Sequence, residues 1–189
     1  IHTLTGGPVK DSTIAIHGLG PIGLFAVDVA RQMGASNIIA IDWDNKYRMD
    51  IARTLGADLV LGKDDDVQAA IFEATDGAGV DNSCEFSGSS AALANAIKTT
   101  RMGGYLNILG VYGSEPKVPI NDIVFRYLHV KGINGRRMWA TWDTMQELMV
   151  EGELKIRDVL THRFPPKAFK TAIRLMLSGE CGKVVLDFN

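Results

Sequence analysis

Short apolar runs alternate with helical patterns along most of this 189-residue chain. The runs TIAI (13–16) and NIIAI (37–41) are nearly continuous stretches of strand-forming residues, which is typical of strands covered by helices on both faces. Residues 21–33, between these runs, show helical periodicity, and Asp28 lies on their polar face. This order predicts a parallel sheet with helices on both faces, in which the two runs are the innermost strands.

The same alternation continues toward the C-terminus. Further strands are predicted at residues 57–61, 80–86, 105–109 and 128–133, and further helices at 45–55, 65–74, 91–101 and 141–151. Six strands with this spacing are typical of the doubly wound α/β (Rossmann) fold, which we expect over residues 1–155. Residues 156–189 form a C-terminal tail, in which the segments 155–164 and 182–188 are predicted as strands on either side of a helix at 166–178.

Composition excludes several classes of partner. The formal charge is -2 and no polybasic run is present, which argues against binding to nucleic acid or to an anionic membrane. The sequence contains no apolar stretch of about 18 residues that could span a membrane. Cys84 and Cys181 form no C-x-x-C pair, so we expect reduced thiols in a cytoplasmic protein.

A glycine-rich turn follows the first predicted strand. Gly18, Gly20 and Gly23 match G-x-G-x-x-G directly after that strand and at the start of a helix. In this pattern the first glycine permits the tight turn, the second lets the backbone approach a pyrophosphate, and the third allows close packing of helix and strand. Pro21 fits the first helical position, where no N–H is needed. The sequence therefore predicts a dinucleotide site at the start of this helix.

An acidic residue follows at the end of the second predicted strand. Asp42 comes 19 positions after Gly23, where a carboxylate accepts hydrogen bonds from a ribose diol. Because a carboxylate repels a 2′-phosphate, NAD is favoured over NADP. Asp44 is a second candidate for this role, and the guanidinium of Arg48 would cap either a hydroxyl pair or a phosphate.

Longer motifs extend this pattern into a family resemblance. They include GPIGLFAV (20–27), EFSG (85–88), GGYLNILG (103–110) and SGECGKVVL (178–186). With them the chain resembles the zinc-type medium-chain dehydrogenases over nearly its whole length. The resemblance implies oxidation of a secondary alcohol, a small-molecule substrate, with hydride transfer to NAD and a catalytic zinc that polarises the alcohol oxygen.

The resemblance also implies roles for individual residues. Positions matching Gly18, Gly20, Ile22 and Gly23 hold the pyrophosphate, those matching Asp42 and Arg48 hold the adenosine ribose, and those matching Leu109, Gly110, Val111, Ile133 and Asn134 line the nicotinamide. Ser87, at the end of the strand 80–86, either touches the cofactor or belongs to a plain turn.

Other parts of the family pattern are not found in this sequence. The zinc-binding lobe, with its Cys ligand and Gly-His-Glu motif, is expected before Ile1, so this chain supplies no catalytic residue or metal ligand and is expected to be inactive alone. The resemblance implies that the tail returns to that catalytic domain. It also implies that the sixth strand pairs across a homodimer or homotetramer.

Two polar residues in the predicted sheet have alternative interpretations. Glu85 is either a buried, hydrogen-bonded carboxylate or an edge-facing, solvated one, and we expect the second. His17, beside the glycine turn, is expected to be structural.

Two other functions remain open. An NAD-binding or sensing module without catalysis would share the glycine turn and the acid. Dinucleotide binding without turnover would favour this module over an enzyme. A Rossmann methyltransferase also has a glycine turn followed by an acid, although six strands and the G-x-G-P-x-G form argue against it. Binding of S-adenosylmethionine in place of NADH would favour that alternative.

Overall fold

The main sheet of the protein has six parallel strands in the order β3-β2-β1-β4-β5-β6. The structure is a computed structural model that describes residues 1–151 and 154–188. The strands are β1 (Thr13–His17), β2 (Asn37–Ile41), β3 (Leu59–Leu61), β4 (Val80–Glu85), β5 (Thr100–Ile108) and β6 (His129–Gly132). The predicted doubly wound fold is therefore confirmed.

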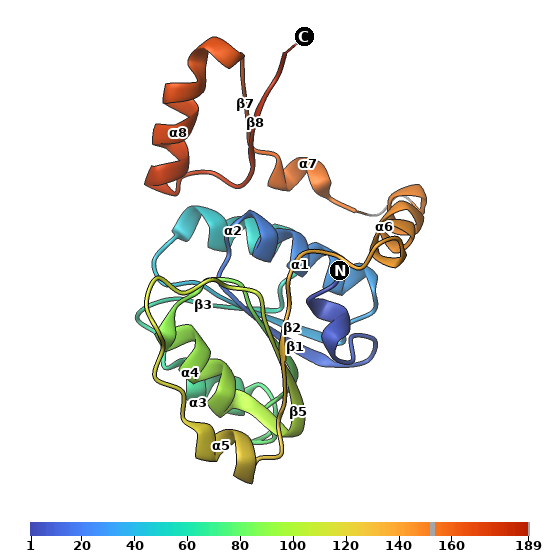
Figure 1. The fold of residues 1–189 in the computed structure, drawn as a ribbon, viewed down its shortest axis with the longest axis vertical. Helices are drawn as coiled ribbons and strands as arrows, with labels where there is room; N and C mark the ends of the chain where they lie inside the picture. The colour runs from blue at the N-terminus through green and yellow to red at the C-terminus, as the bar shows by residue number, and fades with distance from the viewer. Residues whose placement is uncertain (152–153, 189) are drawn as a thin grey trace.

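Helices cover both faces of this sheet (Figure 1). The helices are α1 (Pro21–Gln32), α2 (Lys46–Thr54), α3 (Val67–Glu73), α4 (Ser90–Thr99), α5 (Ile120–Phe125) and α6 (Ala140–Val150), and a 3₁₀ helix, η1 (Leu4–Gly6), precedes β1. Side chains of η1, α1 and α2 share one core cluster with Ile14 and Ile16 of β1, while α3 packs with Ala15 on the opposite face. Alternate residues of one strand thus face two separate cores, as in a sheet buried on both sides.

The prediction of the two innermost strands is wrong for β2. The centre of the sheet is formed by β1 and β4, and β2 lies one position outward. The polar composition of β4 did not indicate a central strand, because its polar residues Asn82, Ser83 and Glu85 are buried and hydrogen-bonded within the protein. The Asn82 side-chain amide donates to the carbonyls of Leu4 and Pro8, both at 2.9 Å. The segment around η1 therefore satisfies a polar strand in the interior.

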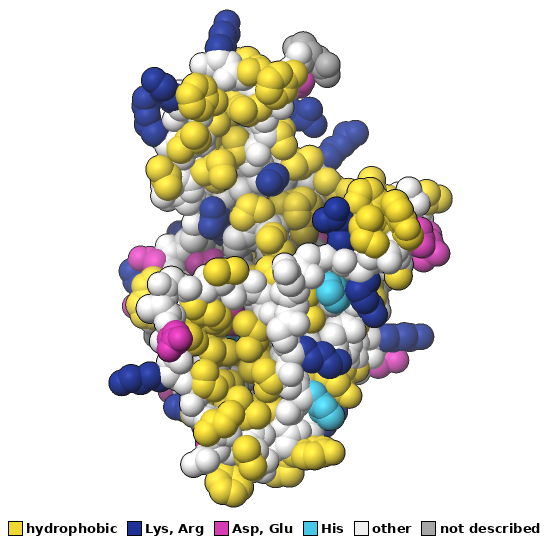
Figure 2. All heavy atoms as spheres, in the orientation of Figure 1, with side chains coloured by type: hydrophobic (Ala, Val, Ile, Leu, Met, Phe, Trp, Pro, Cys, Tyr) yellow, Lys and Arg dark blue, Asp and Glu magenta, His cyan; other side chains and the backbone are white. Residues whose placement is uncertain are grey.

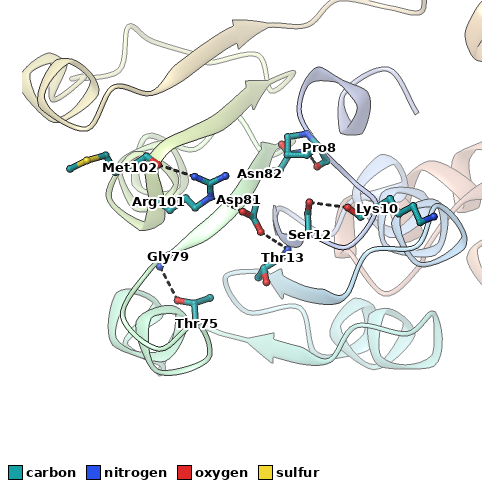
Figure 3. Close-up of polar contacts among 10 residues, drawn as sticks. All are labelled: Pro8, Lys10, Ser12, Thr13, Thr75, Gly79, Asp81, Asn82, Arg101 and Met102. Carbon is teal, nitrogen blue, oxygen red and sulfur yellow. Dashed lines mark hydrogen bonds and ion pairs between the residues drawn. The ribbon is translucent and has the colours of Figure 1, made fainter.

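The amino ends of three strands are joined by Asp81 (Figure 3). Its Oδ2 accepts a hydrogen bond from the Thr13 N–H at 2.8 Å, and its Oδ1 forms an ion pair with Arg101 Nε at 2.6 Å. Because these residues belong to β4, β1 and β5, one half-buried carboxylate fixes their relative position. This end of the sheet is the structural end, opposite the edge where ligands bind in such folds.

The face of α1 predicted to be polar lies partly in the interior. Asp28 is only 1% exposed, and its Oδ2 accepts a hydrogen bond from the Lys155 N–H at 2.8 Å. Burial raises the pKa of Asp28, and the hydrogen bond from Lys155 opposes this shift. Asp28 therefore anchors the start of the C-terminal tail on α1.

The tail forms a small unit beyond α1 and α2 (Figure 1). It contains α7 (Ile156–Val159), β7 (His162–Phe164), the 3₁₀ helix η2 (Pro166–Ala168), α8 (Phe169–Ser178) and β8 (Val184–Leu186), and its two strands pair in parallel. The strand predicted from residue 155 is wrong for residues 156–159, which form α7. This helical turn buries Val159 in the core cluster of α1. The domain boundary at 155/156 remains a prediction.

Hydrophobic side chains gather on the surface of the tail and of α6 (Figure 2). They include Phe169, Ile173, Met176 and Leu177 of α8, and Trp142, Met145 and Met149 of α6. Among the described residues, no helix is both long enough and apolar enough to cross a membrane.

Candidate functional site

A cavity of about 560 Å³ opens at the carboxyl ends of β1, β2, β3 and β4. This is the edge where the strand order reverses between β1 and β4, and such a reversal leaves a crevice in an open α/β sheet. Five of the residues predicted to bind the cofactor line it: Gly18, Gly20, Asp42, Arg48 and Ser87. The structure therefore brings the glycine turn, the acid and the end of β4 to one site.

The three glycines of the turn have different surroundings. Gly18 has a φ of +95°, which favours glycine, and its N–H donates to the Ile41 carbonyl at 2.8 Å. A Cβ on Gly23 would lie 1.9 Å from the Gly18 carbonyl oxygen, so helix and turn pack too closely there for a side chain. A Cβ on Gly20 would meet no atom within 4 Å. A Cβ on Gly18 would lie 2.7 Å from Ser87 Cβ, so the turn is closed by Ser87 at Gly18, by its own packing at Gly23, and open toward the cavity at Gly20.

The carboxylate of Asp42 is held by backbone donors. Its Oδ2 accepts from the Leu19 N–H at 2.8 Å, and its Oδ1 accepts from the Trp43 N–H at 2.7 Å. A carboxylate oxygen has two lone pairs, so each oxygen keeps the capacity to accept from a ligand. Asp42 is therefore oriented in the cavity wall by the glycine turn itself.

Arg48 lies between the cavity and the C-terminal tail. It occupies the first turn of α2, where its N–H donates to the capping Asn45 Oδ1 at 3.0 Å. Its Nε donates to the carbonyl of Cys181 at 2.8 Å, while the residue also lines the cavity. Asn45 reaches the same tail loop through the Gly179 carbonyl at 2.8 Å. This part of the site is thus tied to the tail.

The remaining predicted site residues lie outside the wall of this cavity. Pro21, Ile22 and Gly23 belong to the first turn of α1; Leu109, Gly110 and Val111 follow β5; Ile133 and Asn134 follow β6. The cavity wall, as far as the chain is described, includes none of these. Those after β5 and β6 leave the same edge of the sheet, and Val111 is 91% exposed. Their assignment to the nicotinamide remains a prediction.

The structure adds cavity residues that the sequence analysis missed. Trp43 lines the cavity and is 73% exposed, and its position directly after Asp42 is a signal that the sequence offered. Gln68 and Asn95 also line the cavity and form an amide hydrogen bond of 3.0 Å. They come from α3 and α4, so only their contact in space reveals them. Asp44, the second candidate acid, instead pairs with Lys63 at 2.6 Å.

The expectation that Glu85 is solvated is wrong. The residue is 0% exposed, and its carboxylate accepts hydrogen bonds from Ser87 N–H at 2.7 Å, Gly88 N–H at 3.0 Å and the Tyr112 hydroxyl at 2.9 Å. It is buried because β4 is central and the loop that follows folds back over its end. His17 on neighbouring β1 is also buried, and burial lowers its pKa to about 4. Neither ring nitrogen of His17 has a hydrogen-bond partner in the described part of the chain, and the residue lines the cavity, so its structural role remains a prediction.

The described residues include His, Cys, Asp and Glu side chains, the usual metal ligands. No group of three or more His, Cys, Asp or Glu in this part of the chain is arranged to hold a metal ion. Cys84 is buried, and burial raises the pKa of its thiol to about 12, which disfavours the thiolate that a metal requires. The described residues do not fit a catalytic zinc, so no step of the chemistry is assigned to zinc on this chain.

The fold and the cavity together define a Rossmann-type cofactor-binding domain of a dehydrogenase. Residues 21–151 match the family model described as zinc-binding dehydrogenase. The chain therefore belongs to the zinc-binding dehydrogenase family.

Similar proteins fall in the same family. The chain is 41% identical to a protein of Bacillus licheniformis named L-threonine 3-dehydrogenase, over 98% of this chain and 54% of that protein. It is similar to the structure of an alcohol dehydrogenase of Thermus sp. ATN1, with a TM-score of 0.91 and 26% identity over 100% of this chain and 55% of the other. The structure of 2R,3R-butanediol dehydrogenase from Bacillus subtilis matches with a TM-score of 0.88 and 27% identity, over 98% of this chain and 54% of the other. The chain thus spans about half the length of these proteins.

Proposed function

We propose that this chain binds NAD in the cavity at the carboxyl edge of the sheet and serves hydride transfer from a secondary alcohol. The observation on which this depends is the Asp42 carboxylate, fixed by the Leu19 N–H beside the open position at Gly20. An anion-accepting turn and a diol-accepting acid at this spacing suit the pyrophosphate and the adenosine ribose of one dinucleotide.

Each residue of the site has a defined task in this proposal. The backbone N–H groups at the start of α1, from Gly20 through Gly23, face the pyrophosphate with the positive end of the helix dipole. Asp42 accepts from the ribose hydroxyls, and its charge disfavours the 2′-phosphate of NADP. Arg48 and Ser87 lie beside the adenosine half of the cofactor. When bound, NAD supplies the hydride acceptor, and its nicotinamide lies along the loops that hold Leu109, Gly110, Val111, Ile133 and Asn134.

The substrate is proposed to be a secondary alcohol of the threonine or polyol type. Relatives at 34% to 41% identity are named L-threonine 3-dehydrogenase, and the segments GINGRRMWATW (132–142) and THRF (161–164) resemble that enzyme in particular. A butanediol dehydrogenase among the structural matches keeps the polyol open. A catalytic zinc is proposed for the whole enzyme, on residues outside this chain.

The wider biological setting is also a proposal. We place the protein in the cytoplasm as a homodimer or homotetramer. The two cysteines are free thiols, as expected in a reducing compartment. All four residues of β6 are exposed and β6 ends the order of the sheet, which suits pairing with a second copy through this strand.

Calorimetric titration of the purified protein with NADH and NADPH tests the proposal. We expect NADH to bind at least about tenfold more tightly than NADPH, which corresponds to about 1.4 kcal/mol. The matched variant is Gly20→Ala, whose methyl group meets no protein atom within 4 Å. It should fold normally and lose NADH binding, because the methyl group would occupy the space of the pyrophosphate. Absence of NADH binding by folded wild-type protein would overturn the proposal.

Turnover separates an enzyme from a binding module. NADH formation from NAD and L-threonine or a vicinal diol, by the complete zinc-loaded protein, supports the dehydrogenase. Binding of NADH without turnover of any such alcohol would favour the module without catalysis. The methyltransferase alternative receives no support from the family match.

A further inference from the structure

The buried carboxylate of Glu85 joins two loops at the carboxyl edge of the sheet. One loop follows β4 and contains Ser87, which lines the cavity. The other follows β5, spans residues 109–113, and contains Tyr112. Glu85 is 0% exposed, and both of its carboxylate oxygens accept hydrogen bonds from these loops.

The two oxygens of this carboxylate have different donors. Oε1 accepts from the Ser87 N–H at 2.7 Å, the Ser87 hydroxyl at 2.5 Å and the Gly88 N–H at 3.0 Å, all within the β4 loop. Oε2 accepts from the Tyr112 hydroxyl at 2.9 Å and shares the Gly88 N–H at 3.3 Å. Tyr112 is thus the donor that the β5 loop contributes. In the described part of the chain, no lysine or arginine forms an ion pair with Glu85.

The backbones of the two loops are also in close contact. The Leu109 and Gly110 N–H groups donate to the Glu85 main-chain carbonyl at 2.9 and 3.1 Å. A Cβ on Gly110 would lie 2.3 Å from Glu85 Oε2, and a Cβ on Gly88 would lie 2.3 Å from the Val111 carbonyl oxygen. Any shift of the β5 loop therefore disturbs this packing and the Tyr112 hydrogen bond together.

The protonation of Tyr112 suits a permanent donor. Burial is the largest cause that raises the pKa of the Tyr112 hydroxyl, and the hydrogen bond to Glu85 raises it further. The phenol therefore keeps its proton at neutral pH. Its ring also packs against the cluster of α4 and β5 that contains Leu93 and Leu106, so the side chain is held at both ends.

We infer that Tyr112 is a positioning residue: by donating to Glu85 it holds the loop 109–113 in place for the nicotinamide half of the cofactor. This inference rests on the proposed function. Tyr112 lies one residue beyond Val111 and does not line the cavity that suits the adenosine half. Loss of the Tyr112 hydroxyl should therefore weaken the binding of ligands that reach the β5 loop. It should leave unchanged the binding of ligands that end before this loop.

Two ligands separate these halves. NADH carries the nicotinamide, whereas ADP-ribose has the same adenosine and pyrophosphate without the nicotinamide ring. If the competent arrangement of the loop falls to about a tenth of the population in Tyr112→Phe, the apparent Kd for NADH rises about tenfold. The Kd for ADP-ribose should change less than about twofold. Calorimetric titration of both ligands into wild-type protein and Tyr112→Phe measures these changes.

The matched control is Tyr105→Phe. It removes the same hydroxyl from a tyrosine of β5 that stacks on His129, with ring centroids 4.6 Å apart, and that does not line the cavity. Both Kd values should equal those of the wild type. Amide hydrogen exchange over residues 109–113 gives an independent measurement and should speed up in Tyr112→Phe only.

Three results would overturn the inference. If wild-type protein binds both ligands and Tyr112→Phe binds NADH as tightly as the wild type, the positioning role fails while NAD binding stands. An equal rise of the Kd values for NADH and ADP-ribose in Tyr112→Phe also contradicts the positioning role, since it indicates general damage to the binding site. If wild-type protein binds neither ligand, the proposed function fails and the positioning role fails with it.

Discussion

The Asp42 carboxylate and the Leu19 N–H form a hydrogen bond of 2.8 Å that joins the end of β2 to the turn after β1. The acid expected to select the cofactor is therefore also a support of the turn expected to hold its pyrophosphate. Removing the whole Asp42 side chain would abolish both roles at once. A variant that keeps the shape of aspartate is therefore needed to separate them.

Asp42→Asn is that variant. Its amide oxygen can still accept from Leu19 N–H, while the negative charge is lost. We expect the NADH Kd to rise about tenfold, and the preference for NADH over NADPH to fall by a similar factor, because the repulsion of the 2′-phosphate disappears. Titration with both nucleotides measures this. Asp50→Asn, an exposed carboxylate paired with Arg53, is the control and should leave the preference unchanged. An unaltered preference in Asp42→Asn would remove Asp42 from cofactor selection.

Gly23→Ala should destabilise the fold. Its Cβ would lie 1.9 Å from the Gly18 carbonyl oxygen, so α1 must move away from the turn, at a cost of about 3 kcal/mol or more. Gly20→Ala, three residues earlier, meets open space at a φ of -60°, and its free energy of unfolding should change by less than about 0.5 kcal/mol. Denaturant unfolding of both variants compares them. Equal stability would show that the packing at Gly23 is not limiting.

His17 should make the stability depend on pH. Burial lowers its pKa from 6.5 to about 4, so the unfolded chain binds more protons than the native protein between these values. The contribution of His17 to the free energy of unfolding is fully present above pH 6.5. It is lost as the pH falls toward 4, by up to about 3 kcal/mol.

The slope of that dependence can be measured by urea unfolding at several pH values. His17→Gln should flatten it over this window, whatever its stability at neutral pH. Equal slopes in wild-type protein and His17→Gln would mean that His17 is not the group that titrates.

Asp28→Ala should loosen the start of the tail. The Lys155 N–H would lose its acceptor at 2.8 Å, and a hydrogen bond to a charged group contributes about 1.5–3 kcal/mol. Local opening should therefore become roughly tenfold or more frequent, and trypsin should cleave faster after Lys155 and Arg157. Mass spectrometry of timed digests detects these cuts. If the digests match those of the wild type and of Asp50→Ala, the Asp28 contact does not hold the tail.

Local patterns in the sequence predicted much of the fold and part of the candidate site. The alternation of strand-like runs and helical segments predicted all six strands of the main sheet, and burial on both faces explains the nearly continuous apolar runs of β1 and β2. The glycine spacing and Asp42 predicted the turn and the acid, since both depend on residues close in sequence to a strand end. The 3.6-residue pattern of α1 also predicted a polar face, but it did not show that the tail would bury Asp28 there.

Contacts between distant segments were decided only by the tertiary structure. The polar strand β4 became central because η1 satisfies Asn82, and Glu85 became buried because two loops supply its donors. Gln68 and Asn95 met in the cavity wall because α3 and α4 pack side by side. The hydrogen-bond partner of a buried polar group comes from whichever segment folding brings against it. Hydrophobic periodicity records only that a position is covered, so the sequence determined the elements and the turn, and the tertiary structure determined the partners.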